Sequence, residues 1–215
     1  DKLRSIDSLS DNKFKACTID ITFELKKEAS LEKLLENELD RICKLAKKST
    51  DNYNIIILSD RNVSKNRMAV PALLACSATH QHLIKEGLRT HTGLVVDTGS
   101  AKEIHHFALL AGYGAEAICP WLAFKTIEGI SDDLSTAQNN YIKAVGKGLF
   151  KVMSKMGIST YQSYCGAQIF EAVGLNQNFI DQYFYGTSTN IEGIGIKEIA
   201  EEISRIHQKA FGDDP

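Results

Sequence analysis

The chain has 215 residues, of which 43% are hydrophobic, and a formal net charge of −2 at pH 7. This length and composition predict one large or two small domains with a substantial core. Because 25 basic residues face 27 acidic ones, no strong positive field favours nucleic acid or an anionic membrane as a partner. No apolar run approaches the ~20 residues that span a bilayer, so we expect no membrane partner.

The cysteines and the N-terminal stretch predict a cytoplasmic protein. The stretch DKLRSIDSLSDNKF is polar and lacks the apolar core of a signal peptide. The five cysteines lie far apart in the sequence and form no CxxC pair. Scattered cysteines of this kind are typical of small buried side chains in a reducing compartment.

The chain opens with a polar, irregular lead-in and then a strand. Residues 18–25 alternate with a period of two, which predicts a half-buried strand. A helix capped by Ser30 and running to about Lys48 follows. Residues 54–58 (NIIIL) form a short, continuous apolar run, typical of a strand covered on both faces.

The same alternation continues to residue 119. Pro71 fits the first turn of a helix that ends near Lys85, and residues 93–97 (GLVVD) predict another buried strand. A helix over 101–110 and a short strand over 115–119 complete the series. Strands and helices that alternate in this way predict an α/β class with a parallel sheet, here a three-layer domain over residues 1–130.

Polar side chains follow two of the predicted strands. Because the carboxyl ends of parallel strands meet at one edge of the sheet, we expect these side chains to line a common crevice. One interpretation is a nucleotide site, although no GxGxxG follows a strand. The other, which we favour, is a structural role at the strand ends. The residues concerned are Asp60, Arg61, Asp97, Thr98 and Ser100.

The second half of the chain is mostly helical. Periodicity predicts helices over 121–130, 135–153, 179–184 and 196–211. Residues 185–190 are predicted to form a loop.

The stretch from Lys151 to Leu175 predicts a strand, a turn and a helix. Residues 151–156 form a short, mostly apolar run that Gly157 ends, and a helical pattern begins at Gly166. A strand that hands over to a helix presents free backbone N–H groups, which is how α/β proteins hold phosphorylated or planar cofactors. Packing without any ligand is the alternative.

Four histidines are candidates for a metal site. His80 and His82 lie two apart on a predicted helix, and His105 and His106 are adjacent, so the side chains of each pair diverge. No HExxH or comparable spacing is present. We therefore predict no metal ligands.

Three long blocks stand out in the sequence. They read LLACSATHQHLIKEGLRTHTGLVVDTG, KEIHHFALLAGYGAEAICPWLAF, and NYIKAVGKGLFKVMSKMGISTYQSYCGAQIFEAVGL followed by YGTSTNIEGIGIKEIA. In this order they resemble the large subunit of glutamate synthase, from its central domain into the start of its FMN-binding domain. The resemblance implies a parent enzyme that makes two glutamates from glutamine, 2-oxoglutarate and reductant. It further implies FMN and an iron–sulfur cluster in that parent, with the glutaminase domain and the rest of a (β/α)8 flavin barrel as partners.

The resemblance also implies cofactor-binding residues. Ser154, Lys155, Met156, Gly157 and Ser159 match the first barrel strand beneath the flavin, where the lysine would lie near a reduced flavin anion. The alternative is a strand end with a solvated lysine. The family pattern differs at three positions, where Asn, Tyr and Arg are usual in place of Cys119, Trp121 and Asn190.

Most of the parent's chemistry is not expected in this chain. Position 1 is Asp rather than a nucleophilic cysteine, and no cysteine cluster could hold iron and sulfur. Residues 131–215 number 85, whereas a complete barrel needs ~250, so we expect only its N-terminal portion there. We therefore predict no catalytic residues and a fragment or truncated product that serves as a connector. Two alternatives stay open, namely an interaction module that docks through residues 153–175 and a nucleotide-binding domain.

Overall fold

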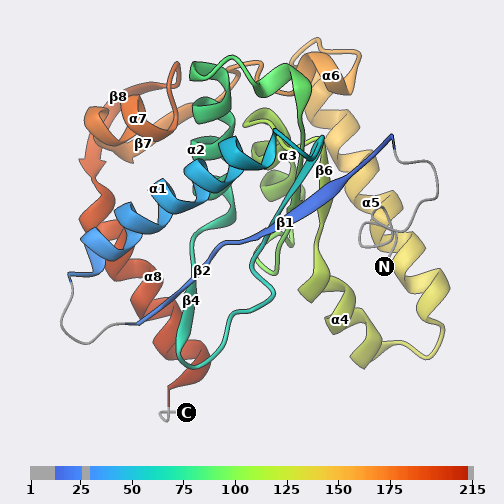
Figure 1. Cartoon of the computed structure of the whole chain (residues 1–215). Coiled ribbons are helices and arrows are strands. Elements are labelled where there is room, and N and C mark those ends of the chain that lie inside the picture. Colours follow the sequence, from blue (N-terminus) through green and yellow to red (C-terminus); the bar gives the residue numbers. More distant parts are fainter. Residues whose placement is uncertain (1–12, 26–29, 213–215) are drawn as a thin grey trace.

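A computed structural model describes residues 13–25 and 30–212. Most of the predicted polar lead-in, residues 1–12, lies outside the described residues. The centre of the fold is a parallel sheet in the order β1-β3-β5-β6, which confirms the predicted α/β class (Figure 1). Its strands are β1 (Ala16–Asp20), β3 (Ile55–Ser59), β5 (Gly93–Asp97) and β6 (Ala117–Cys119).

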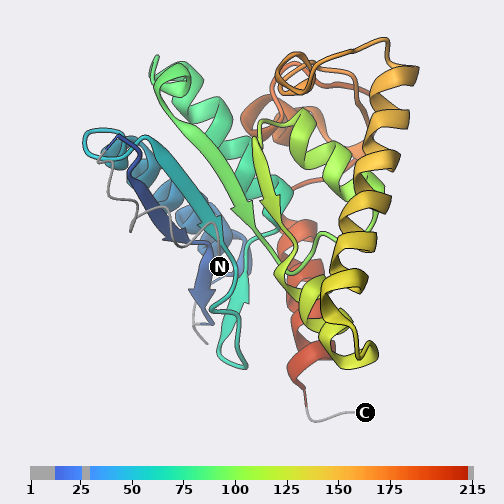
Figure 2. The same ribbon diagram turned by 90° about the vertical axis from the view of Figure 1, so that its right-hand side faces the viewer.

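The spatial order of the strands follows their order in the chain. Each crossover therefore proceeds in the same direction, and right-handed crossovers in one direction place their helices on one face. The connecting helices α1 (Leu31–Ser49), α2 (Ala72–Lys85) and α3 (Ile104–Gly112) share one hydrophobic core with that face of the sheet. Figure 2 shows α2 and α3 beside the twisted strands. The order never reverses, so the sheet has no topological switch point.

Helix α2 is buried on two sides. One side contacts β3 and β5, and the other contacts α7 (Gln177–Tyr183). The hydroxyl of Ser77 donates to the carbonyl oxygen of Tyr183 at 2.5 Å. A helix buried in this way is apolar around most of its circumference, as the sequence ALLACSATHQHLIK shows. Helix α7 thus forms a further layer outside the helices that cover the sheet.

The predicted strand over 18–25 divides between two sheets. Its first part is β1, and its second part, β2 (Thr22–Glu24), pairs antiparallel with β4 (Arg67–Ala69). Ile21 lies at the division, where its N–H donates to the carbonyl of Ser59 and its carbonyl accepts from the N–H of Val70, both at 2.9 Å. The sequence analysis did not predict β4.

The predicted strand over 151–156 is wrong, because this stretch is the end of a long helix. Helix α5 (Leu134–Lys155) runs on through Lys, Val, Met and Ser without a breaker. Gly157, with φ +70°, ends it in a Schellman motif. The N–H of Gly157 donates to the carbonyl oxygen of Ser154, and the N–H of Ile158 donates to the carbonyl oxygen of Met153 at 3.0 Å.

The predicted helix from Gly166 to Leu175 is also wrong. Gly166 and Gln168 have φ values of +78° and +51°, which no helix accommodates. The chain then forms β7 (Glu171–Leu175), which pairs in parallel with β8 (Ser188–Ile194). Strand β8 begins inside the predicted loop over 185–190 and so replaces its second half.

The remaining helices pack around this frame. Helix α4 (Trp121–Ile130) and helix α8 (Ile196–Phe211) have the bounds that periodicity predicted, while the short helices η2 (Arg89–His91) and α6 (Tyr161–Tyr164) were not predicted. Helix α5 packs on α3, and the hydroxyl of Tyr164 donates to the carbonyl of Ala108 at 3.2 Å. Residues 131–212 therefore pack against the domain formed by the β1-β3-β5-β6 sheet and its helices. Among the described residues, no helix is long and apolar enough to span a membrane.

Candidate functional site at the carboxyl edge of the sheet

A buried carboxylate lies directly after β3. Asp60 is 5% exposed and accepts hydrogen bonds from the Thr98 hydroxyl at 2.5 Å, the Gly99 N–H at 3.0 Å and the Trp121 indole N–H at 2.6 Å. Burial raises the pKa of Asp60, although these three donors act in the opposite direction. The carboxylate thereby joins the ends of β3 and β5 to the start of α4.

A second carboxylate lies at the end of the neighbouring strand. Asp97 accepts from Arg61 Nε at 2.6 Å and Nη2 at 3.0 Å, and from the Ser59 hydroxyl at 3.0 Å. The guanidinium carbon of Arg61 lies 5.4 Å from the centroid of the Trp121 ring, within the range of a cation–π contact. The two carboxylates and their partners form one network, which we call the edge network.

The structure brings the predicted strand-end residues together, but they bind one another. Ser100 also belongs to the edge network, because its hydroxyl lies 2.9 Å from that of Thr98. Trp121 is a member that sequence reasoning missed, since nothing in the residues around it indicated a contact with Asp60. With the donors and acceptors paired internally and no switch point in the sheet, the described residues give no support to a nucleotide site.

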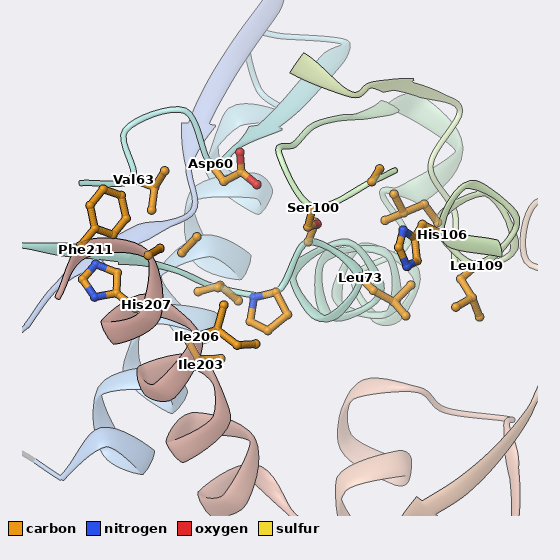
Figure 3. Close-up of a pocket in the computed structure, with 17 residues that line it drawn as sticks. Asp60, Val63, Leu73, Ser100, His106, Leu109, Ile203, Ile206, His207 and Phe211 are labelled. Atoms are coloured by element: carbon orange, nitrogen blue, oxygen red, sulfur yellow. The ribbon is translucent and has the colours of Figure 1, made fainter. Parts of the chain in front are cut away.

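An apolar hollow of about 380 Å³ lies beside the edge network, between α8 and the start of α2 and α3. Figure 3 shows Ile203, Ile206 and Phe211 along α8 on one side, and Leu73 and Leu109 on the other. A hollow of this composition can hold apolar side chains or a small apolar molecule.

The polar groups that reach this hollow have structural partners. His106 Nδ1 accepts from the backbone N–H groups of Lys102 and Glu103 at 3.2 and 3.3 Å. His207 Nε2 lies 2.8 Å from the carbonyl oxygen of Ser64. The arrangement caps α3 and anchors α8, and it presents no nucleophile paired with a base.

The histidines do not form a metal centre. His80 Nδ1 accepts from Arg89 Nε at 2.9 Å, and burial, with the charge of Arg89, lowers the pKa of His80 to about 4. His105 packs edge-on against Phe170 with ring centroids 6.2 Å apart. Within residues 13–25 and 30–212, no group of three or more His, Cys, Asp or Glu could hold a metal ion.

The predicted flavin residues lie elsewhere, around the C-terminus of α5. Ser154 and Lys155 end the helix, and Met156, Gly157 and Ser159 follow it. All five are exposed, and Ser154, Gly157 and Ser159 line an open hollow of about 350 Å³.

Two features of the helix end work against flavin binding by this chain alone. The N–H groups of Met156 and Gly157 donate to carbonyls within the helix cap, so they are not available to a cofactor. The C-terminus of a helix carries a partial negative charge that opposes a phosphate. The described residues therefore do not form a flavin site by themselves.

The positions that depart from the family pattern have identifiable roles. Trp121 belongs to the edge network. Cys119 Sγ lies 3.8 Å from Arg61 Nη2. Asn190 on β8 donates to the carboxylate of Glu171 on β7, which cross-links the small parallel sheet at a position where an arginine could form an ion pair.

The fold is an α/β domain with a parallel sheet, and the polar groups of its edge network bind one another. Comparison with known proteins identifies the family. A family model described as "Glutamate synthase central domain" matches residues 1–176, and the chain belongs to this family.

The chain is similar to glutamate synthases from several organisms. The chain is 44% identical to the glutamate synthase [NADPH] large chain of Bacillus subtilis over 96% of its length, and 40% identical to the chloroplastic ferredoxin-dependent glutamate synthase of Spinacia oleracea, again over 96%. It is 38% identical to the glutamate synthase [NADH] of Schizosaccharomyces pombe over 99%. The chain spans 14% of the first two relatives and 10% of the third.

Proposed function

We propose that this chain acts as the central-domain segment of a glutamate synthase large chain. In that enzyme it connects the glutaminase domain to the flavin barrel and sets their relative position. The reaction, which converts glutamine, 2-oxoglutarate and reductant to two glutamates, belongs to the other parts. The observation that carries the proposal is the edge network, because its polar groups bind one another and so stabilise a scaffold.

In this proposal, the assembled enzyme binds FMN and the iron–sulfur cluster, and this chain alone binds neither. We propose that Ser154, Lys155, Met156, Gly157 and Ser159 approach the flavin once further barrel strands are present. Their exposure leaves them accessible to such strands. The division into a central part, residues 1–130, and the N-terminal portion of the barrel domain, residues 131–215, belongs to the same proposal.

A segment exchange tests this function. The matching segment of the Bacillus subtilis large chain is replaced by this sequence, and glutamine-dependent glutamate formation is measured. We expect the chimera to retain activity, because a scaffold with the same fold positions the same neighbours. A second chimera that carries Trp121→Ala should lose part of this activity, because the substitution weakens the edge network. A soluble, FMN-loaded chimera without activity would contradict the proposal.

The alternative function is an interaction module that docks onto separately encoded parts of a split enzyme. The small sheet β7–β8 favours it, since Val173 and Ile191 are 68% and 63% exposed and parallel strands are normally covered. The predicted docking surface over 153–175 would include Val173. Met153 cannot contribute to it, because its side chain is 4% exposed and packs with Ala111 and Tyr164.

A further inference from the structure

The solvent-facing side of α5 carries two adjacent ridges. Residues four apart along a helix form such a ridge. One ridge consists of Ile142, Gly146 and Phe150, and the two large side chains are 54% and 69% exposed. The ridge beside it, one residue further along at each step, is formed by four exposed lysines, Lys143, Lys147, Lys151 and Lys155. We call these the apolar ridge and the lysine ridge.

The lysine ridge has no acidic partner among residues 13–25 and 30–212. In the part of the chain that the structure describes, none of the four ammonium groups forms an ion pair. The whole chain has a net charge of −2, so the ridge is a local positive surface on a slightly acidic protein. It therefore attracts an acidic partner rather than reflecting the composition of the chain.

The apolar ridge has a notch at its centre. A Cβ added at Gly146 would meet nothing within 4 Å, so the helix backbone is open between Ile142 and Phe150. A notch of this kind admits an apolar side chain from another helix close to the backbone. The inward face of α5 is already occupied, since Val145, Leu149 and Val152 pack against the body of the protein.

We propose that this surface docks an acidic amphipathic helix. An apolar side chain of that helix occupies the notch at Gly146 between Ile142 and Phe150, and carboxylates beside it face the lysine ridge. Helices that pack into a groove are recognised through residues spaced in the same way. The proposal goes beyond the connector function and does not depend on it.

A membrane surface fits these observations less well than a helix does. Helices that lie in a lipid interface insert a broad apolar face next to their basic residues. The broad apolar face of α5 is turned inward, and the apolar ridge contains two large side chains, Ile142 and Phe150. The notch between them also matches a single protruding side chain better than it matches acyl chains.

Binding of a labelled synthetic helix to the full chain tests the proposal. The probe carries leucine at every fourth position with glutamates on both flanks, and fluorescence anisotropy reports binding. We expect saturable binding that weakens with added salt. Gly146→Leu fills the notch and Lys147→Glu reverses one charge, and each should weaken binding about tenfold or more. Lys33→Glu makes the same charge change on an exposed position of α1 and should leave binding unchanged.

Circular dichroism of each variant confirms that the fold is retained, since both α5 positions face solvent. The proposal is overturned by any of three results. These are no saturable binding of the helix, equal binding by the Gly146→Leu chain, and tighter binding to phosphatidylserine vesicles than to the helix.

Discussion

At the residue scale, the most consequential side chain is the carboxylate of Asp60. It collects donors from Thr98, Gly99 and Trp121, which belong to two further segments of the chain. In a buried position, removal of such an acceptor leaves the N–H groups of Gly99 and Trp121 without a partner, and this costs more than the hydrogen bonds contribute on balance. Asp60 therefore stabilises the edge where β3, β5 and α4 meet.

We expect Asp60→Ala to lower the free energy of unfolding by about 2–4 kcal/mol. Urea denaturation followed by circular dichroism measures the change. Asp51→Ala is the matched control, because Asp51 is exposed in a turn and its loss should alter stability little. Equal stability of the two variants would mean that the edge network contributes nothing to the fold.

The sequence predicted where the members of this network lie, because polar residues that follow parallel strands meet at one edge. It could not predict whether they face a ligand or one another. That outcome depends on Trp121, which reaches Asp60 from a helix 61 positions along the chain. No local pattern specifies a contact of that kind.

At the element scale, helix α5 and the turn that ends it contain glycines in three different environments. Gly146 faces open space, Gly148 has no room for a Cβ because Ile104 lies against it, and Gly157 has a φ of +70° at the helix end. Helical propensity favours alanine over glycine at an open interior position. Crowding and the left-handed backbone reverse that preference at the other two sites.

Alanine at the three positions should therefore shift stability in different directions. We expect Gly146→Ala to raise the free energy of unfolding by about 0.5–1 kcal/mol and Gly157→Ala to lower it by about 1–2 kcal/mol. Gly148→Ala should lower it as well, by about 1–3 kcal/mol, through contact with Ile104. Thermal melts of the three proteins give the order, and a stabilised Gly157→Ala chain would contradict the helix end described here.

Elements with a strong local signal were predictable from the sequence, and elements defined by distant pairing were not. Helices α4 and α8 have the predicted bounds because an apolar stripe at helical spacing is a local property. Strand β4 has three residues, too few to show alternation, and β8 contains Asn and Gly in the sequence STNIEGI. Both strands are defined by partners that lie far along the chain.

At the scale of the whole molecule, the second half of the chain covers the first. Phe179 and Ile180 on α7 are 4% and 1% exposed and belong to the same core as Leu74 and Cys76 on α2. The family match also extends across residue 130. The predicted boundary between residues 130 and 131 stays a prediction, but the packing shows that the sheet unit shares its core with the helices of the second half.

A chain that ends at residue 130 should therefore fail to fold as the full chain does. Without α7, one side of α2 loses its cover, and the exposed apolar surface should bind the dye ANS. We expect weak or absent cooperative unfolding in urea, with the full chain as control. A truncated chain with the same cooperative transition as the full one would show that residues 131–215 are dispensable for the fold.

The central claim is that this chain is a scaffold whose own residues do not hold the flavin without the rest of the barrel. FMN fluorescence, titrated with the purified full chain, tests it most directly. We expect no saturable quenching, because the α5 terminus is exposed and its N–H donors are paired. Saturable quenching that disappears in the Ser154→Ala, Lys155→Ala double variant would contradict the claim and would place a flavin site at the end of α5.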